Sequence, residues 1–134
     1  MTRTWPIIAV SDVTKSSVWY SRLLAAQQTH PGATVFDQII DGDATVLLCL
    51  HHFGPSGSRG DHNWPSLSKP AQGSAGAGLL LWFVVDDFDA AWERAQKLDA
   101  AIEESPNNDN GTGMRAFVVR DPDGYYVAVN EARV

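Results

Sequence analysis

Apolar residues in the first part of the chain change from a continuous run to a helical spacing at Asp12. The run at residues 7–10 predicts a buried strand. After Asp12, residues spaced three or four apart would share one face of a helix, namely Val13, Ser17, Tyr20 and Leu24. Either Asp12 or Thr14 can accept hydrogen bonds from the free amides of the first helical turn. We therefore expect a strand, then a helix that packs on a sheet.

The same pattern begins again in the second half of the chain. The apolar run at residues 80–85 precedes Asp86 and Asp87 and predicts a second strand. Apolar positions at helical spacing follow it, namely Phe88, Ala91, Trp92, Ala95 and Leu98. Asp89 is expected to be the N-cap of this helix. The chain thus reads as an internal duplication.

After each predicted helix the pattern returns to strands that flank a turn. Residues 34–40 and 44–50 flank Asp41-Gly-Asp43, and residues 116–120 and 125–129 flank Asp121-Pro-Asp-Gly124. In the second turn the proline fixes φ and the glycine accepts a positive φ. These features predict a hairpin in each half of the chain.

A long linker separates the two halves. Residues 54–78 are rich in Gly, Ser and Pro, and the sizeable apolar anchors in or beside them are Phe53, Trp64 and Leu67. A segment of this length without periodicity is uncommon in a compact domain unless it covers a site or joins two modules. Both interpretations apply here.

Composition and charge narrow the possible partners. The 134 residues carry 10 Lys and Arg against 16 Asp and Glu, a formal net charge of -6, which would repel a nucleic acid backbone. The longest apolar runs are too short to span a bilayer, and the first residues lack a signal-peptide core, so we expect no membrane association and a cytoplasmic location. Cys49, the single cysteine, is expected to be a buried thiol.

Several short motifs, in this order, resemble the vicinal-oxygen-chelate superfamily, the glyoxalase, bleomycin resistance and dioxygenase proteins. They are Val10-Ser-Asp-Val13 with Trp19-Tyr20, Val85-Asp-Asp-Phe-Asp89, and Gly113-Met-Arg115 followed by Asp121-Pro-Asp-Gly124. The resemblance implies an α+β fold in which two tandem βαβββ modules form a cup-like, barrel-like mixed sheet. One domain of residues 1–134 would then comprise module one at about 4–53, the linker at 54–78 and module two at about 79–132.

The resemblance also identifies positions that usually hold a metal. Relatives place a ligand seven residues before the Asp that ends the first strand of each module, which gives Trp5 and Leu80 here, and another four residues after the last hairpin Gly, which gives Ala128. None of these side chains can donate an electron pair to a cation. We therefore expect no metal and no other cofactor.

The fourth ligand position falls near the end of the predicted strand that contains His51 and His52. Neighbouring residues on a strand face opposite ways, so at most one of the two should line a pocket. A lone inward histidine is more often a hydrogen-bonding or packing residue than a ligand. His62 in the linker could join it, although no spacing supports this.

Aromatic residues share the alternation phase of the replaced positions. Trp5, Trp82 and Tyr126 should face the cavity of the cup and favour a flat apolar or heteroaromatic ligand. The alternative is that they fill a core. Asn130 continues the phase as a polar group at the cup mouth, and Arg115 could pair either with an anionic ligand or with acidic neighbours.

The leading functional hypothesis is a metal-independent small-molecule binding protein that sequesters an aromatic or cationic antibiotic-like ligand. A first alternative is a lyase, isomerase or dioxygenase of the same superfamily, with a non-standard metal site or with His51 or His52 as general base. A second is a non-catalytic subunit that binds another protein. The expected partners are a small molecule and a second copy of the chain, because joining modules buries their open faces.

Overall fold

The computed structural model describes residues 1–55, 63–70 and 76–132. The chain divides into two compact units, unit 1 at residues 1–71 and unit 2 at residues 72–134, and each is described by itself. None of the helices among the described residues is long and apolar enough to cross a membrane.

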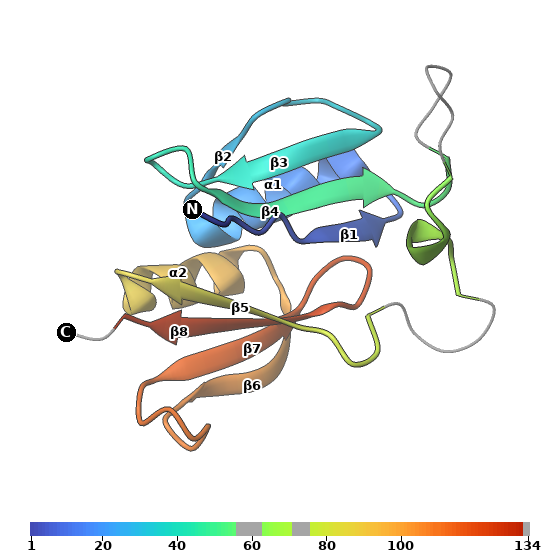
Figure 1. Cartoon of the computed structure of the whole chain (residues 1–134). Coiled ribbons are helices and arrows are strands. Elements are labelled where there is room, and N and C mark those ends of the chain that lie inside the picture. The colour runs from blue at the N-terminus through green and yellow to red at the C-terminus, as the bar shows by residue number, and fades with distance from the viewer. Residues whose placement is uncertain (56–62, 71–75, 133–134) are drawn as a thin grey trace. The chain divides into compact units, whose positions relative to one another are not determined.

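The described residues of unit 1 form one α-helix, a four-stranded sheet and a short 3-10 helix (Figure 1). Its elements are β1 (Ile7–Val10), α1 (Val13–Leu24), β2 (Gln27–Gln28), β3 (Phe36–Ile40), β4 (Val46–His52) and the short 3-10 helix η1 (Pro65–Leu67). The sheet order is β1-β4-β3-β2, in which β1 pairs with β4 in parallel and the other neighbours are antiparallel.

Unit 2 repeats this topology. Its elements are β5 (Leu80–Val85), α2 (Phe88–Lys97), β6 (Ala101–Asn107), β7 (Ala116–Arg120) and β8 (Tyr126–Glu131). The order β5-β8-β7-β6 again joins the first and last strands in parallel and the others antiparallel. The expected α+β fold with two βαβββ modules is therefore confirmed.

Aspartate side chains begin both helices. Asp12 accepts a hydrogen bond from the backbone N–H of Lys15, and Asp87 accepts one from that of Ala90, each at 3.0 Å. The prediction that Asp89 caps α2 is wrong, because the non-helical N-cap residue is Asp87 and Asp89 is already in the first helical turn. There its negative charge still interacts favourably with the positive end of the helix dipole.

In each unit the helix covers one face of the sheet, and the core lies between them (Figure 1). In unit 1 the α1 residues that pack there include Tyr20 and Leu23. Leu23 is buried in place of the expected Leu24, because the three-residue step from Tyr20 keeps it on the same helix face. In unit 2 Phe117 is buried against the rings of Phe88 and Trp92, with centroids 5.6 and 5.1 Å away.

A carboxylate is buried in the core of unit 1. Asp37 on β3 is fully buried and accepts hydrogen bonds from Nε2 of Gln28, the hydroxyl of Thr29, and the backbone N–H groups of His30 and Gln38. Burial alone would raise the pKa of this carboxyl, but the hydrogen bonds outweigh it and leave the pKa below its ordinary value of 3.8. Asp37 therefore ties the segment before β3 to the strand.

Two glycines before β5 give a matched stability prediction. Both Gly76 and Gly78 have positive φ, +79° and +82°, but only at Gly76 would an added Cβ overlap the ring of the buried Tyr125. Both alanine variants should lose stability from the backbone strain. We expect Gly76→Ala to lose about 1–3 kcal/mol more than Gly78→Ala, because the ring must also move. Urea unfolding measures both, and equal losses would show that the Tyr125 contact is unimportant.

Candidate functional site

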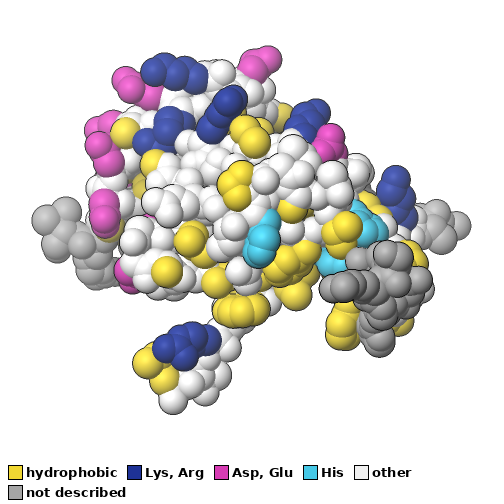
Figure 2. All heavy atoms as spheres, turned by 90° about the horizontal axis from the view of Figure 1, so that it is seen from above, with side chains coloured by type: hydrophobic (Ala, Val, Ile, Leu, Met, Phe, Trp, Pro, Cys, Tyr) yellow, Lys and Arg dark blue, Asp and Glu magenta, His cyan; other side chains and the backbone are white. Residues whose placement is uncertain are grey.

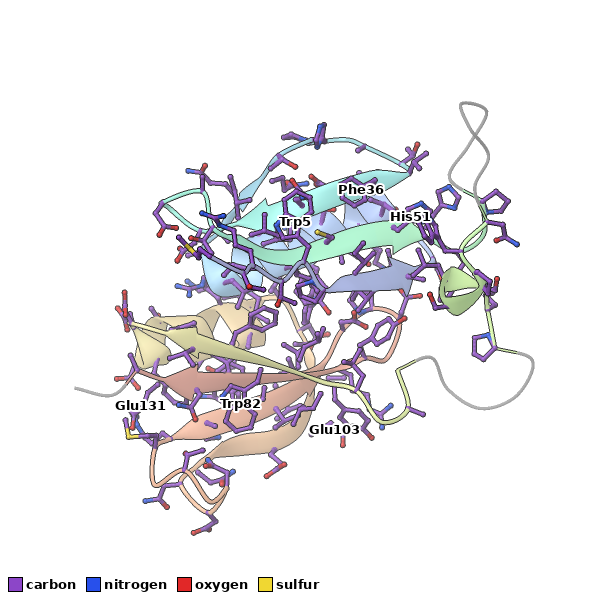
Figure 3. All side chains as sticks on the ribbon, in the orientation of Figure 1. Trp5, Phe36, His51, Trp82, Glu103 and Glu131 are labelled. Atoms are coloured by element: carbon purple, nitrogen blue, oxygen red, sulfur yellow. The ribbon has the colours of Figure 1, made fainter. Side chains whose placement is uncertain are left out.

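The face of the unit 1 sheet opposite α1 carries two rows of side chains. Strand register places Ile7, Cys49 and Gln38 side by side in one row. The next row holds Ala9, His51 and Phe36. Figure 3 shows Phe36 and His51 on their neighbouring strands, β3 and β4. This face is free of the helix and can therefore present side chains to a ligand.

A pocket of about 460 Å³ lies on this side of unit 1, and is called the unit 1 pocket below. Its volume is in the range of small-molecule sites. The described lining residues are mostly apolar or aromatic: Ile7, Val35, Phe36, His51, Trp64, Ser66 and Leu67. Figure 2 shows histidine and apolar side chains side by side on the face drawn there. Such a lining suits a ligand with a flat apolar body.

The linker supplies one wall of this pocket. Residues of η1 and Trp64 before it line the pocket, and Leu67 is buried. The backbone N–H of Gly54 donates to the carbonyl of Leu67 at 3.1 Å and holds the segment against the end of β4. Residues 63–70 thus pack against unit 1 and form one wall of this pocket. The rest of the linker at 56–62 and 71–75, with His62, lies outside the described residues.

His51 is the polar group deepest in the pocket wall. Its side chain belongs to a residue that is only 6% exposed, and its Nδ1 lies 2.5 Å from the carbonyl oxygen of His52. A carbonyl oxygen can only accept, so Nδ1 donates its proton to it, and in this tautomer Nε2 is the acceptor of the ring. No described residue gives Nε2 a hydrogen-bond partner. His51 therefore lines the pocket, and its Nε2 is a buried acceptor without a partner among the described residues.

The other two unit 1 residues expected at the site lie elsewhere. The ring centroid of His52 lies 4.8 Å from that of His51, and its Nδ1 lies 2.7 Å from the carbonyl oxygen of Phe53. Trp5 is more than half exposed, in the segment before β1, and neither residue is among the described lining of the unit 1 pocket. Within unit 1 the structure thus brings His51, and not His52 or Trp5, to the pocket.

The face of the unit 2 sheet opposite α2 has the predicted alternation. Leu80 pairs with Tyr126, and Trp82 pairs with Ala128. A pocket of about 530 Å³ lies here, lined by Tyr126 and Arg120 among others but not by Trp82. The Arg120 guanidinium lies 4.2 Å from the centroid of the Tyr126 ring and forms an ion pair with Glu103. Arg120 is thus already engaged by protein groups on both sides.

Asn130 occupies in unit 2 the position that His51 occupies in unit 1. His51 pairs with Ala9 on β1, and Asn130 pairs with Val84 on β5. Ala9 lies two residues after Ile7, and Val84 lies two residues after Trp82. Ile7 and Trp82 lie equally far before the aspartates that cap the two helices, Asp12 and Asp87, so the two positions correspond. Asn130 is 7% exposed, its Nδ2 donates to the carbonyl oxygen of Glu131 at 2.7 Å, and its Oδ1 has no partner among the described residues. Both modules thus carry the same arrangement.

Arg115 is paired with acidic groups of its own unit. Its guanidinium lies 3.1 Å from Asp89 and 3.0 Å from Glu131, and it stacks on the ring of Phe88. The hydrogen bond to Glu131, and then that to Asp89, raise the pKa of Arg115. It is not among the described lining of either pocket. Of its two expected roles, the contacts match pairing with neighbours.

The positions at which relatives hold a metal do not fit one here. Trp5, Leu80 and Ala128 offer no donor atom, and the register identifies Cys49 as the unit 1 equivalent of Ala128. Burial raises the pKa of the Cys49 thiol, which disfavours the thiolate that a metal requires. No group of three or more His, Cys, Asp or Glu side chains in the described part of the chain could hold a metal ion.

Sequence reasoning missed most of the pocket wall. Phe36 could have been found from the hairpin, since it shares the alternation phase that places it opposite His51. Trp64 and Leu67 stood out as apolar anchors in a polar linker, but no periodicity assigned them to a wall.

Comparisons with known proteins agree with this architecture. The family profile described as Glyoxalase/Bleomycin resistance protein/Dioxygenase superfamily matches residues 4–129. Comparison with curated proteins finds no match. Among solved structures, a protein from the mobile metagenome of V. Pseudocholerae is 21% identical, with 100% of this chain and 97% of that chain covered at a TM-score of 0.68.

Two further structures are similar at lower identity. TioX from Micromonospora sp. ML1 is 16% identical, with 99% of this chain and 98% of that chain covered at a TM-score of 0.63. The fosfomycin resistance protein FosX from Mesorhizobium loti is 15% identical, with 99% and 93% covered at a TM-score of 0.64. These likenesses show the fold, and the profile match over nearly the whole sequence shows the family: the chain belongs to the glyoxalase/bleomycin resistance protein/dioxygenase superfamily.

Proposed function

We propose that this protein binds a small aromatic molecule without the aid of a metal, and that the ligand occupies the unit 1 pocket. One observation carries the proposal: a pocket of about 460 Å³ combines apolar and aromatic walls with a single buried acceptor, Nε2 of His51. A few placed polar groups in an apolar concavity are typical of small-molecule sites.

The walls can supply the affinity that such a role needs. Burial of roughly 200 Å² of a ligand's ring surface, at about 25 cal/mol per Å², contributes about 5 kcal/mol before the cost of association. Phe36 and Trp64 add flat surfaces on which a ring can stack. We therefore expect dissociation constants of about 0.1 mM to several millimolar for simple bicyclic aromatic compounds. A natural ligand with more contacts would bind more tightly.

The biological role in this proposal is sequestration of an aromatic, antibiotic-like compound, by a homodimer in the cytoplasm. Sequestration requires only that the ligand be held, and the replaced metal positions at Trp5, Leu80 and Ala128 are compatible with that role. The net charge of -6 would also favour the approach of cationic compounds to the protein surface.

Calorimetry with protein dialysed against a chelator tests the binding function. A panel of bicyclic aromatic compounds should include binders, and their affinities should be the same before and after dialysis. Elemental analysis of protein purified without chelators accompanies the titrations. An affinity that disappears with the chelator and returns with one stoichiometric metal would contradict the proposal.

The unsatisfied Nε2 of His51 also favours a second candidate, an enzyme that uses this atom as a general base. An imidazole with its Nδ1–H held by the carbonyl of His52 has Nε2 left as the atom that can accept a proton from a bound compound. In this case the bound compound would be converted. Mass spectrometry of each binder after prolonged incubation separates the candidates, since a binding protein returns every compound unchanged.

A further inference from the structure

We infer that the ligand of the unit 1 pocket is an uncharged aromatic molecule that presents an O–H or N–H group to Nε2 of His51. This inference rests on the proposed binding function and adds the chemical class of the ligand. Three features of the described residues carry it: the tautomer of His51, the absence of a compensating charge, and the repeat of the arrangement at Asn130.

The tautomer fixes the polarity of the site. Nδ1 of His51 donates its proton to the carbonyl of His52, and in this tautomer the buried Nε2 is the ring's acceptor. A buried acceptor without a partner costs about 1–3 kcal/mol, and a ligand that donates to it recovers this free energy. A carboxylate, phosphonate or ether oxygen placed there would instead meet a second lone pair. The site therefore selects a donor.

The charges around the pocket select against ions. None of its described lining residues carries a carboxylate, an ammonium or a guanidinium group, so a charged ligand would be desolvated without a counter-ion. Lys69, two residues after Leu67, lies over the ring of Phe53 and is not in the described lining. The acidic surface can attract a cation to the protein, but the pocket offers no anion to hold it.

Unit 2 also has a buried acceptor at the equivalent strand position, but an amide provides it instead of an imidazole. The amide NH2 of Asn130 donates to the carbonyl of Glu131, as Nδ1 of His51 donates to that of His52, and in both cases the atom left over is an acceptor. An amide cannot reverse its role here without losing that bond. Both modules therefore have an acceptor at the same strand position, an imidazole in one and an amide in the other. The feature that they share is the acceptor and not a base or a metal ligand.

Titration with matched naphthalene probes tests the inference by calorimetry. The probes are 2-naphthol, 2-fluoronaphthalene, which is of similar size but has no donor, 2-naphthoate, and the cation 2-naphthylmethylammonium. The proteins are the wild type, His51→Leu, and the control His52→Leu, which changes a side chain that contacts the His51 ring but is not in the described lining of the pocket. The readout is the ratio of 2-naphthol affinity to 2-fluoronaphthalene affinity.

The ratio should be roughly tenfold larger in the wild type and in His52→Leu than in His51→Leu, the effect of one hydrogen bond to a buried acceptor. The naphthoate and ammonium probes should bind more weakly than 2-naphthol to the wild type. If His51→Leu fails to fold, the ¹⁵N resonance of Nε2 in the wild type serves instead, and 2-naphthol but not 2-fluoronaphthalene should shift it. An unchanged ratio or unshifted resonance while the neutral probes bind would overturn the inference and leave the binding function intact. Binding of no naphthalene probe would contradict both.

Discussion

Asp37→Ala is expected to lose roughly 3 kcal/mol or more of the free energy of unfolding, because it removes a fully buried acceptor and leaves several donors without a partner. The carboxylate accepts from side chains of Gln28 and Thr29 and from the backbone of His30 and Gln38. Each buried donor left unsatisfied costs about 1–3 kcal/mol, with partial relief from water that enters the space. Urea unfolding of the variant and the wild type measures the loss.

The same carboxylate predicts a pH dependence. Its pKa is below the ordinary value of 3.8, so the native state stabilises the ionised form. This contribution is present in full above the ordinary pKa and is lost as the pH falls through the lower, folded-state value. Asp37→Asn keeps the shape of the side chain but cannot ionise. Its stability should therefore fall less than that of the wild type on acidification below about pH 4, and parallel curves would show that Asp37 does not contribute.

Asp37 also connects stability with the site. It lies on β3 next to Phe36, which points to the opposite face of the sheet and lines the unit 1 pocket. The hydrogen bonds of Asp37 fix the strand on the α1 side, and this positions Phe36 beside His51 on the other side. A loss of stability in Asp37→Ala should therefore be accompanied by weaker ligand binding at temperatures well below the unfolding transition.

The strands and helices could be predicted because local patterns determine them. Each module begins with an apolar run, an aspartate cap and a helical spacing, and each hairpin has its own turn residues. The turn at Asp121–Gly124 forms as predicted, with Gly124 at a φ of +91° and its N–H bonded to the carbonyl of Asp121. The cap of α2 was misplaced because Asp87 and Asp89 offer the same chemistry, and only the backbone conformation distinguishes them.

The pocket could not be predicted to the same extent because it depends on register and on tertiary contacts. A bulge between Ile39 and Ile40 shifts the pairing of β3 and β4, so turn length alone does not show which residue faces His51. Trp64 reaches the pocket only because the Gly54 contact returns the linker to unit 1. Neither effect has a periodic signal in the sequence. The family resemblance, in turn, directed attention to Trp5 and Trp82, which line neither described pocket.

Obstruction of the unit 1 pocket tests the account most directly. Ser66 lines the pocket, whereas Ser68, at the end of the same short helix, is exposed and is not in the described lining. Tryptophan at position 66 would place a bulky ring where the ligand's ring should lie, while tryptophan at position 68 leaves that space unchanged. Both positions are exposed, so the two variants should have similar stability.

The decisive measurement is the 2-naphthol affinity of Ser66→Trp and Ser68→Trp by calorimetry, compared with the wild type. The account predicts a loss of at least about a hundredfold for Ser66→Trp, since most of the roughly 5 kcal/mol from ring burial is removed, and a change of less than about twofold for Ser68→Trp. Wild-type affinity in a folded Ser66→Trp would contradict it, because the ligand would then bind somewhere other than the pocket between His51, Phe36 and the linker.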